Sequence, residues 1–213
     1  PRVLYLSYDG LLEPLGQSQI IPYARGLDQR GAAITLLSYE KPADLAHRDA
    51  VARLREDLAR HHIRWVALTY HKRPRTLATL FDVMVGIASS VMLIHRERIR
   101  FVHVRSYVPA LMGWILKRWM GVAFIFDMRG FWADERVDGG LWKPRSLLYR
   151  IAKKLERTFV AEAAEIVTLT ERARATVKSW IDQRPTPITV IPTCVDLERF
   201  RRQHAKATNG IDP

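Results

Sequence analysis

Residues 124–135 combine side chains that can do chemistry, in the order Phe-Ile-Phe-Asp-Met-Arg-Gly-Phe-Trp-Ala-Asp-Glu. An apolar run typical of a strand leads directly into Asp127, Arg129 and Trp132. Carboxylates and a guanidinium form directional hydrogen bonds, and open α/β folds bind ligands beside the carboxyl ends of their strands. The segment predicts a site for a polar, ring-shaped ligand, and a sugar is the first to consider. The alternative is a loop leading into a helix, whose acids cap backbone amides and whose Phe131 and Trp132 fill the core.

Polar residues also follow two other apolar runs. His103 lies within the run 101–104, which Arg105 follows, and Glu171 comes after the run that ends at Leu169. Because side chains alternate along a strand, His103 and Arg105 are expected on one face, and His103, Arg105 and Glu171 are candidate substrate contacts. A histidine bonded to the backbone is the structural alternative for His103, and Thr170 as a helix N-cap explains the other run.

Asp127 is the strongest candidate for a catalytic role. A carboxylate beside Arg129 can orient a sugar hydroxyl or take part in proton transfer. A salt bridge with a purely structural function explains the same pair of residues.

A loop with two glycines follows the first apolar run. Gly10 and Gly16 are six residues apart, and a helical pattern starts at Gln17. Amides at a helix N-terminus favour phosphate, and glycine permits close approach, so Gly16 and Gln17 are candidate phosphate contacts. A turn followed by a helix start is the alternative. The dinucleotide and P-loop glycine motifs are absent, which argues against NAD binding and P-loop chemistry.

Composition limits the class of protein and its partners. The 213 residues are 48% hydrophobic, enough for a substantial core, and the formal charge is +12. A basic chain favours partners that carry phosphate, but no motif for nucleic-acid recognition accompanies the charge. Cys194 is the single cysteine, so neither an intramolecular disulfide nor a thiolate metal cluster is expected. No secretory signal pattern opens the sequence, and a cytoplasmic location is expected.

Strand-like runs alternate with amphipathic stretches along the chain. This order predicts an α/β fold: a three-layer Rossmann-like domain with a mainly parallel sheet of about seven strands. The expected strands are Val3–Ser7, Ile34–Ser38, Arg64–Leu68, Phe101–Val104, Val122–Phe126, Ile166–Leu169 and Ile188–Ile191. The clearest expected helices are Gln17–Arg30, Leu45–His61, Pro109–Met120, Ser146–Ala163 and Glu171–Ile181.

Two stretches raise the question of a membrane. Asp82 interrupts the apolar run 77–94, which is therefore expected to be a helix buried on most sides, with contact to a membrane surface as the alternative. Residues 143–157 hold six basic residues and one acid. The apolar positions of that stretch, expected to form one buried stripe, are Leu147, Leu148, Ile151, Leu155 and Phe159. Its basic face attracts anionic lipid or phosphate, although a solvated helix face explains the charges equally.

One boundary is visible. Residues 1–200 form the predicted domain, and 201–213 are polar without apolar periodicity, which indicates a linker toward a further domain.

Taken together, these segments resemble the N-terminal domain of family 4 glycosyltransferases, which have the GT-B architecture of two facing Rossmann-like domains. The resemblance covers residues 1 to 200 and is most specific over residues 190–200, which read Val-Ile-Pro-Thr-Cys-Val-Asp-Leu-Glu-Arg-Phe. It implies retaining transfer of a sugar from a nucleotide-sugar co-substrate to an acceptor hydroxyl, without a metal or other cofactor. Relatives place His where this chain has Asp127, and Asn-Gly where it has Thr193-Cys194.

The resemblance also implies roles for residues and partners. Gly16 lies near the donor diphosphate, and Asp127 takes the position of the His that contacts the transferred sugar in relatives. In the mechanism that we expect, Asp127, Arg129 and Glu135 orient acceptor hydroxyls and Trp132 stacks on a sugar ring. Most donor contacts belong to a C-terminal domain of the same parent protein, so this chain alone is expected to be inactive. A polyprenyl-linked or other cell-envelope glycan fits the basic surface, as does a peripheral position at the inner membrane face.

Two other classes remain open at this point. One is a non-catalytic Rossmann-like module that docks a membrane surface or a partner protein. The other is an NAD-dependent sugar-modifying enzyme, which predicts tight cofactor binding by this chain alone.

Overall fold

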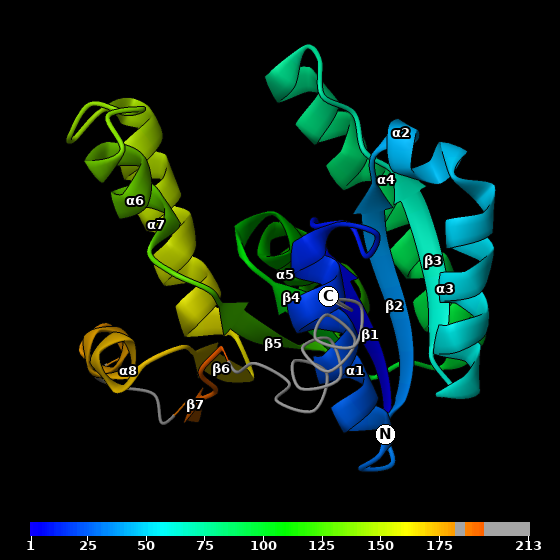
Figure 1. Cartoon of the computed structure of the whole chain (residues 1–213). Helices are drawn as coiled ribbons and strands as arrows, with labels where there is room; N and C mark the ends of the chain where they lie inside the picture. Colours follow the sequence, from blue (N-terminus) through cyan, green and yellow to red (C-terminus); the bar gives the residue numbers. More distant parts are fainter. Residues whose placement is uncertain (182–185, 194–213) are drawn as a thin grey trace, which may run out of the picture.

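The computed structural model describes residues 1–181 and 186–193, which form a sheet covered by helices on both faces (Figure 1). All seven strands are parallel, in the order β3-β2-β1-β4-β5-β6-β7. The strands are β1 (Arg2–Ser7), β2 (Ala33–Glu40), β3 (Arg64–Thr69), β4 (Phe101–Arg105), β5 (Ala123–Met128), β6 (Glu165–Thr168) and β7 (Ile188–Val190). The predicted fold class is confirmed.

The helices follow the expected alternation with the strands. They are the π-helical turn η1 (Gly16–Ile20), α1 (Ile21–Asp28), α2 (Pro42–Ala46), α3 (Arg48–Arg60), α4 (Arg75–Glu97), α5 (Tyr107–Met120), α6 (Trp132–Asp138), α7 (Leu147–Glu162) and α8 (Glu171–Lys178). The helix predicted over 45–61 is divided at His47 into α2 and α3. Thr170 is the predicted N-cap of α8, and its hydroxyl accepts a hydrogen bond of 3.1 Å from the amide of Ala173.

The topology sets the position of the site. The chain runs outward from β1 through β2 to β3, and then returns to pair β4 with the other side of β1. Open α/β folds bind ligands where the strand order reverses in this way, which is here at the carboxyl ends of β1 and β4.

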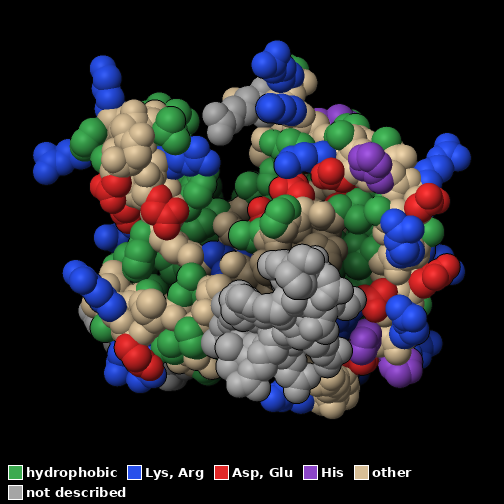
Figure 2. All heavy atoms as spheres, viewed as in Figure 1, with side chains coloured by type: hydrophobic (Ala, Val, Ile, Leu, Met, Phe, Trp, Pro, Cys, Tyr) green, Lys and Arg blue, Asp and Glu red, His purple; other side chains and the backbone are tan. Residues whose placement is uncertain are grey.

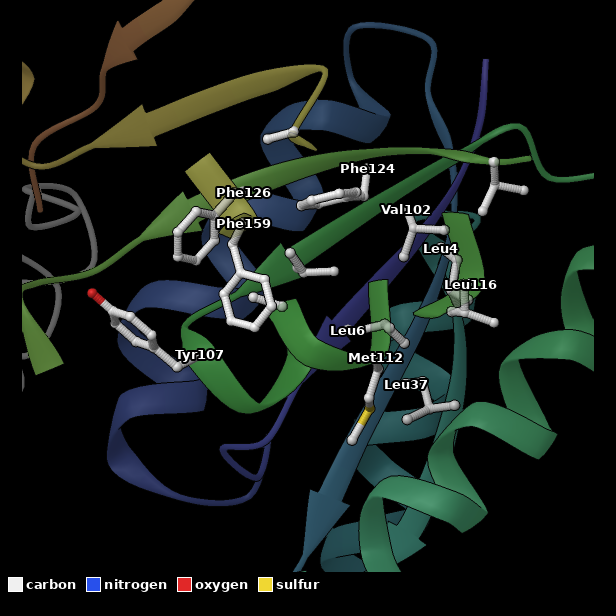
Figure 3. Packing of buried hydrophobic residues seen from close by; sticks show 14 of the residues in the cluster. Leu4, Leu6, Leu37, Val102, Tyr107, Met112, Leu116, Phe124, Phe126 and Phe159 are labelled. Carbon is white, nitrogen blue, oxygen red and sulfur yellow. The ribbon is translucent and has the colours of Figure 1, made fainter. Parts of the chain in front are cut away.

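Two hydrophobic cores cover the two faces of the sheet. Alternating residues of β1 divide between them: Leu4 and Leu6 face α4 and α5, whereas Tyr5 faces α1 and α3. Figure 3 shows the first of these cores, where Phe124 and Phe126 of β5 pack with α5. Tyr5 therefore points to the same face as other odd-numbered residues of the central strands, and this face includes the candidate residues of β4 and β5.

The apolar stripe predicted for α7 is buried only at its C-terminal end. Phe159 is buried, but Leu147, Leu148 and Ile151 are exposed, with 71% of Leu147 accessible. The prediction was wrong for the first two turns, because α7 has 16 residues and β6 only four. A helix of that length spans about 24 Å and such a strand about 13 Å, so the N-terminal end of α7 extends past the sheet.

Helix α4 is likewise buried toward its C-terminal end and exposed toward its N-terminal end. Its C-terminal half is buried through residues such as Leu93 and Ile94, but its exposed large side chains are Leu77, Leu80, Phe81, Met84 and Met92. The expectation of a helix buried on most sides was therefore wrong for the N-terminal half. Its 23 residues span about 34 Å against about 20 Å for the six residues of β1, on which α4 packs.

The stretch Thr76–Glu97 of α4 is long and apolar enough to cross a membrane by length and composition alone, and 44% of an 18-residue apolar part of it is buried inside the protein. Asp82, in this stretch, is buried and accepts a hydrogen bond of 2.8 Å from the hydroxyl of Tyr8. Its carboxylate also lies 2.6 Å from Nδ1 of His71. These contacts fix α4 to the rest of the domain as a packed helix.

The linker predicted for residues 201–213 lies outside the described residues, as does most of the 190–200 segment, from Cys194 onward.

Candidate functional site

Asp127 is the centre of a charged cluster at the carboxyl ends of β4 and β5. Only 3% of this residue is accessible. Its carboxylate lies 3.4 Å from Nη1 of Arg129, 3.6 Å from Nε2 of His103 and 3.7 Å from Nη1 of Arg105. Arg105 and Asp127 are register partners in adjacent strands, and His103 lies two residues before Arg105 on the same face, as predicted.

The cluster keeps Asp127 ionised. Burial raises the pKa of its carboxyl group, but contact with His103 and the charges of Arg129 and Arg105 outweigh burial and hold the pKa below its ordinary value. A general base works best with a pKa near the operating pH. Asp127 is accordingly suited to holding cationic side chains in place, and poorly suited to accepting a proton.

Gln19 joins the two arginines of the cluster. Its side-chain oxygen accepts hydrogen bonds from Nη2 of Arg105 at 2.6 Å and from Nη2 of Arg129 at 3.0 Å. Arg129 also donates to the hydroxyl of Thr193 at 3.0 Å. The cluster therefore connects η1 with β4, β5 and the segment after β7.

Two tyrosine rings pack against the imidazole of His103. The ring of Tyr5 stacks on its imidazole, with centroids 4.5 Å apart, and Tyr23 lies tilted at 5.4 Å. His103 is buried, so it is part of a packed stack and not a half-buried residue at the surface. Burial, followed by the charge of Asp127, raises the pKa of Tyr23 to about 12, so both flanking groups are neutral phenols at physiological pH.

The glycine loop is packed against itself. A Cβ atom at Gly16 would lie 2.2 Å from the carbonyl oxygen of Gly10 and 2.5 Å from Cα of Leu11. Gln17 donates a hydrogen bond of 2.8 Å from its side chain to the carbonyl of Leu11. The structure thus gives both predicted residues a role in folding the loop, and their contact with phosphate remains a prediction.

Glu40 at the end of β2 anchors this loop. Its buried carboxylate accepts hydrogen bonds from the amides of Leu11 at 2.7 Å and Leu12 at 3.2 Å, and from the hydroxyl of Ser38 at 2.6 Å. A charged acceptor shared by consecutive amides fixes the loop more firmly than a neutral group would. The position of Gly16 therefore depends on a residue 24 positions later in the chain.

Trp132 opens α6 and is largely occupied by protein contacts. Its ring stacks on Tyr107 with centroids 5.8 Å apart, meets Trp142 edge-on at 5.0 Å and lies 5.2 Å below the guanidinium of Arg136. This packing agrees with the alternative in which the aromatic residues of the loop fill the core. Stacking of Trp132 on a sugar stays a prediction.

A second polar network holds the loop after β5. The hydroxyl of Tyr107 contacts the buried carboxylate of Glu156 and lies 2.8 Å from the carbonyl oxygen of Gly130. Lys153 pairs with Glu156 and, at 2.8 Å, with Asp134. Burial raises the pKa of Glu156, and its contacts with Lys153 and Tyr107 partly offset this. The network fixes the backbone next to Arg129.

The two remaining predicted residues are Glu135 and Glu171, and the carboxylate of Glu135 lies beside Gly130, which follows Arg129 of the cluster. Glu135 is exposed on α6, and Glu171 is exposed on α8, where it pairs with Arg174 at 3.2 Å. Within residues 1–181 and 186–193, no hydrogen bond or ion pair joins either glutamate to the Asp127 cluster. In the same part of the chain, no group of three or more His, Cys, Asp or Glu residues could hold a metal ion.

Three residues of the site were missed from the sequence. Gln19 and Glu40 have the roles described above, and the carboxylate of Asp9 lies 3.7 Å from Nε of Arg105. Asp9 is the second residue after the first strand, so its position near a strand end was a usable signal. Gln19 gave no such signal, because a helical pattern does not show which of two nearby glutamines faces the strands.

Comparison with known proteins identifies the class. The model of glycosyltransferase family 4 matches residues 19–199, and the chain belongs to this family. A search among curated protein sequences gave no match. Solved structures show that its fold is that of the N-terminal half of GT-B glycosyltransferases.

Three such structures illustrate the likeness. Sucrose-phosphate synthase from Thermosynechococcus elongatus has a TM-score of 0.65 at 12% identity, over 96% of this chain and 52% of the other. HepE from Anabaena, in complex with UDP and glucose, has a TM-score of 0.54 at 15% identity, over 96% and 50%. A glycosyltransferase from Rickettsia africae has a TM-score of 0.55 at 13% identity, over 99% and 50%. The chain spans about half the length of each.

Replacing Gly16 tests the packing of the glycine loop. We expect Gly16→Ala to lower the free energy of unfolding by about 3 kcal/mol, because the new methyl group meets backbone atoms that cannot rotate away. Gly26→Ala in α1 is the control, since its Cβ would meet only the Arg30 side chain at 3.7 Å, and alanine favours a helix by about 0.5–1 kcal/mol. Chemical denaturation measures both, and equal effects would contradict the packing described.

The pH dependence of stability tests the charge on Asp127. A lowered folded-state pKa means that this carboxylate stabilises the fold above its unfolded pKa of about 4, and that the contribution is lost as pH falls through the folded-state value. We expect Asp127→Asn to cost about 3 kcal/mol at neutral pH, and the difference from wild type to shrink in acid.

Asp57→Asn is the control for that experiment. Asp57 pairs with Arg25 and Arg60 where both partners are partly exposed, so its loss should cost about 1 kcal/mol or less. A cost for Asp127→Asn that stays constant from neutral to acidic pH would show that its charge is not what the cluster requires.

Proposed function

We propose that this chain is the acceptor-binding half of a retaining glycosyltransferase, which moves a sugar from a nucleotide-sugar donor to a hydroxyl of a glycan or lipid-linked acceptor. The observation that carries the proposal is the Asp127 cluster at the carboxyl ends of β4 and β5, which Gln19 of η1 links to the end of the glycine loop. Membership of glycosyltransferase family 4 supports the reaction class. The presence of UDP and glucose in the HepE structure supports a nucleotide sugar as donor.

The arginines of the cluster are suited to a diphosphate or to sugar hydroxyls. Arg105 and Arg129 carry two positive charges; Asp127 pairs with both of them, and Asp9 pairs with Arg105. Side-chain accessibility is 5% for Arg105 and 19% for Arg129, so Arg129 is the arginine that reaches toward a substrate. A guanidinium held by a buried carboxylate costs little reorganisation when negative charge develops nearby.

In the transfer, the bond between the anomeric carbon and the diphosphate breaks, and a bond to the acceptor oxygen forms. The ionised, cation-paired Asp127 is a weak proton acceptor, so the acceptor proton leaves with the departing diphosphate. We assign Asp127 to positioning Arg105 and Arg129, and Arg129 to contact with the substrate.

A non-catalytic module that docks a membrane or partner is the other function to separate. The packed cluster of four ionisable groups favours an enzyme, because a docking module has no need for buried charges at a strand edge. A panel of nucleotide sugars and acceptors distinguishes the two when it is offered to the enzyme in which this chain is joined to a donor-binding half.

Replacement of Arg129 tests the assigned role. We expect Arg129→Ala to lower kcat/KM for sugar transfer roughly a hundredfold, which is typical for the loss of one preorganised donor. Arg129→Lys should recover part of the loss, because a charge remains without the planar donor pair. The matched control is Arg60→Ala, an exposed arginine on α3 that should leave transfer unchanged.

Full transfer by a folded Arg129→Ala enzyme would remove the cluster from the mechanism. Binding of the substrates without transfer by the wild type, across the whole panel, would favour the non-catalytic module.

A further inference from the structure

His71 is an exposed histidine held by a buried carboxylate, in a place that the mechanism above does not use. It is the second residue after β3, and 44% of its side chain is accessible. Nδ1 of its ring lies 2.6 Å from Oδ1 of Asp82, and its backbone amide donates to Oδ2 at 3.1 Å. The hydroxyl of Tyr8 donates to the same Oδ2 at 2.8 Å. Because the side chain of Asp82 is only 1% accessible, this carboxylate fixes the orientation of the imidazole.

These contacts leave the second ring nitrogen of His71 for a ligand. An ionised carboxylate only accepts hydrogen bonds, so Nδ1 donates to Asp82, and Nε2 of a neutral imidazole is then an acceptor. Burial and the contact with Asp82 raise the pKa of the Tyr8 hydroxyl, which keeps Tyr8 a neutral donor to the same carboxylate. Within residues 1–181 and 186–193, no hydrogen bond or ion pair involves Nε2 of His71. Such an oriented nitrogen is suited to a hydroxyl, which can both donate and accept.

An exposed phenyl ring stands beside this imidazole. The rings of His71 and Phe81 meet at 84°, with centroids 5.2 Å apart, and Phe81 is 49% accessible. A sugar ring presents C–H groups on its faces and hydroxyls around its rim. It therefore fits an apolar ring face that lies next to a fixed hydrogen-bonding nitrogen.

This pair lies along the same edge of the sheet as the Asp127 cluster, but several strands away. Because β2, β1 and β4 lie between β3 and β5, four strand spacings separate the ends of β3 and β5, or roughly 19 Å. The segment after β1 joins the two places, since Tyr8 contacts Asp82 and the next residue, Asp9, lies 3.7 Å from Arg105. Figure 2 shows the surface hollowed between the projecting end of α4 and helices α6 and α7. A ligand that reaches both places must be longer than one sugar ring.

We propose that His71 and Phe81 form an outer acceptor subsite, which binds a sugar several units away from the hydroxyl that receives the transferred sugar. The inference rests on the proposed function and narrows it, because the acceptor is then an oligosaccharide. Phe81 packs on one face of the bound ring, and Nε2 of His71 bonds one of its hydroxyls. His71 is too far from Arg129 to take part in bond breaking, so it contributes to acceptor binding alone.

A purely structural role for this pair explains less of the geometry. In that role, His71 and Asp82 only join the loop after β3 to α4. This accounts for the contacts of Nδ1 and of the backbone amide, but it gives no use to the exposed Nε2 or to the exposed ring of Phe81.

An array printed with saccharides of one to six sugars tests the subsite without transfer. We expect the chain to bind a set of oligosaccharides and no monosaccharide, because a single ring fills only one of the two places. His71→Asn should weaken this binding about fivefold, the effect of one lost neutral hydrogen bond. Its amide can still donate to Asp82 in place of Nδ1, so thermal unfolding should stay close to wild type. Phe81→Leu, which keeps an apolar side chain but removes the ring face, should weaken binding to a similar extent.

Kinetics of the enzyme in which this chain is joined to a donor-binding half separate the subsite from the reaction itself. With an oligosaccharide acceptor, His71→Asn should raise the KM for the acceptor about fivefold, and leave kcat and the KM for the donor unchanged. With the same acceptor shortened to its terminal sugar, the variant and the wild type should have the same KM. A structural role would change the KM for both acceptors alike.

Matched controls come from the opposite edge of the sheet. His95 is exposed near the C-terminal end of α4, and Phe101 is 40% exposed at the start of β4. His95→Asn and Phe101→Leu should bind and transfer as the wild type does. Imidazole NMR of the ¹⁵N-labelled chain reports the contact directly: the Nε2 resonance of His71 should shift when a bound oligosaccharide is added, and that of His95 should not.

Binding of no oligosaccharide on the array would overturn the proposal. So would a wild-type KM that does not depend on the length of the acceptor, or a change in KM for His71→Asn that is equal for long and short acceptors. Failure of transfer to every acceptor, while oligosaccharides still bind through His71, would instead overturn the proposed function and keep the sugar-binding site.

Discussion

The buried negative charge of Asp127 is the constraint on which the site depends. A carboxylate that is 3% accessible is tolerated only when cations and donors surround it, and here they come from β4, from the residue after β5 and, through Gln19, from η1. Because Asp127 needs all of these partners, it determines how the ends of β4, β5 and η1 are arranged around it. The lowered pKa of Asp127 follows from the same arrangement and makes it a fixed anion in the folded protein.

A second buried carboxylate stabilises the neighbouring loop by the same principle. Glu40 binds the amides of residues 11 and 12 from the end of β2, and Gly16 packs on the backbone that those amides belong to. The glycine loop is thus held by charge from one side and by steric fit from the other. Changes at Glu40 should disturb the site without any contact between Glu40 and substrate.

The alternation of strands and helices could be predicted from the sequence, because β-branched runs and helical periodicity are local properties. The close approach of His103, Arg105 and Asp127 could also be predicted, since parallel strands end at one edge of the sheet. The roles of Gln19 and Glu40 could not be predicted. The role of Gln19 depends on which side of η1 faces the strands, and the role of Glu40 depends on the pairing of β1 with β2. The burial of Leu147, Leu148 and Ile151 was wrongly predicted, because helical spacing identifies an apolar face but not whether the protein supplies a partner for it.

One measurement tests most directly the proposal that substrates bind at the Asp127 cluster. It is a structure of the enzyme, containing this chain and a donor-binding half, with a nucleotide sugar and an acceptor bound. The account predicts that Arg129 stays paired with Asp127 and exchanges its contact with Thr193 for a substrate oxygen. Substrates bound with Arg129 still paired with Gln19 and Thr193, and with no substrate atom near the Asp127 cluster, would contradict it.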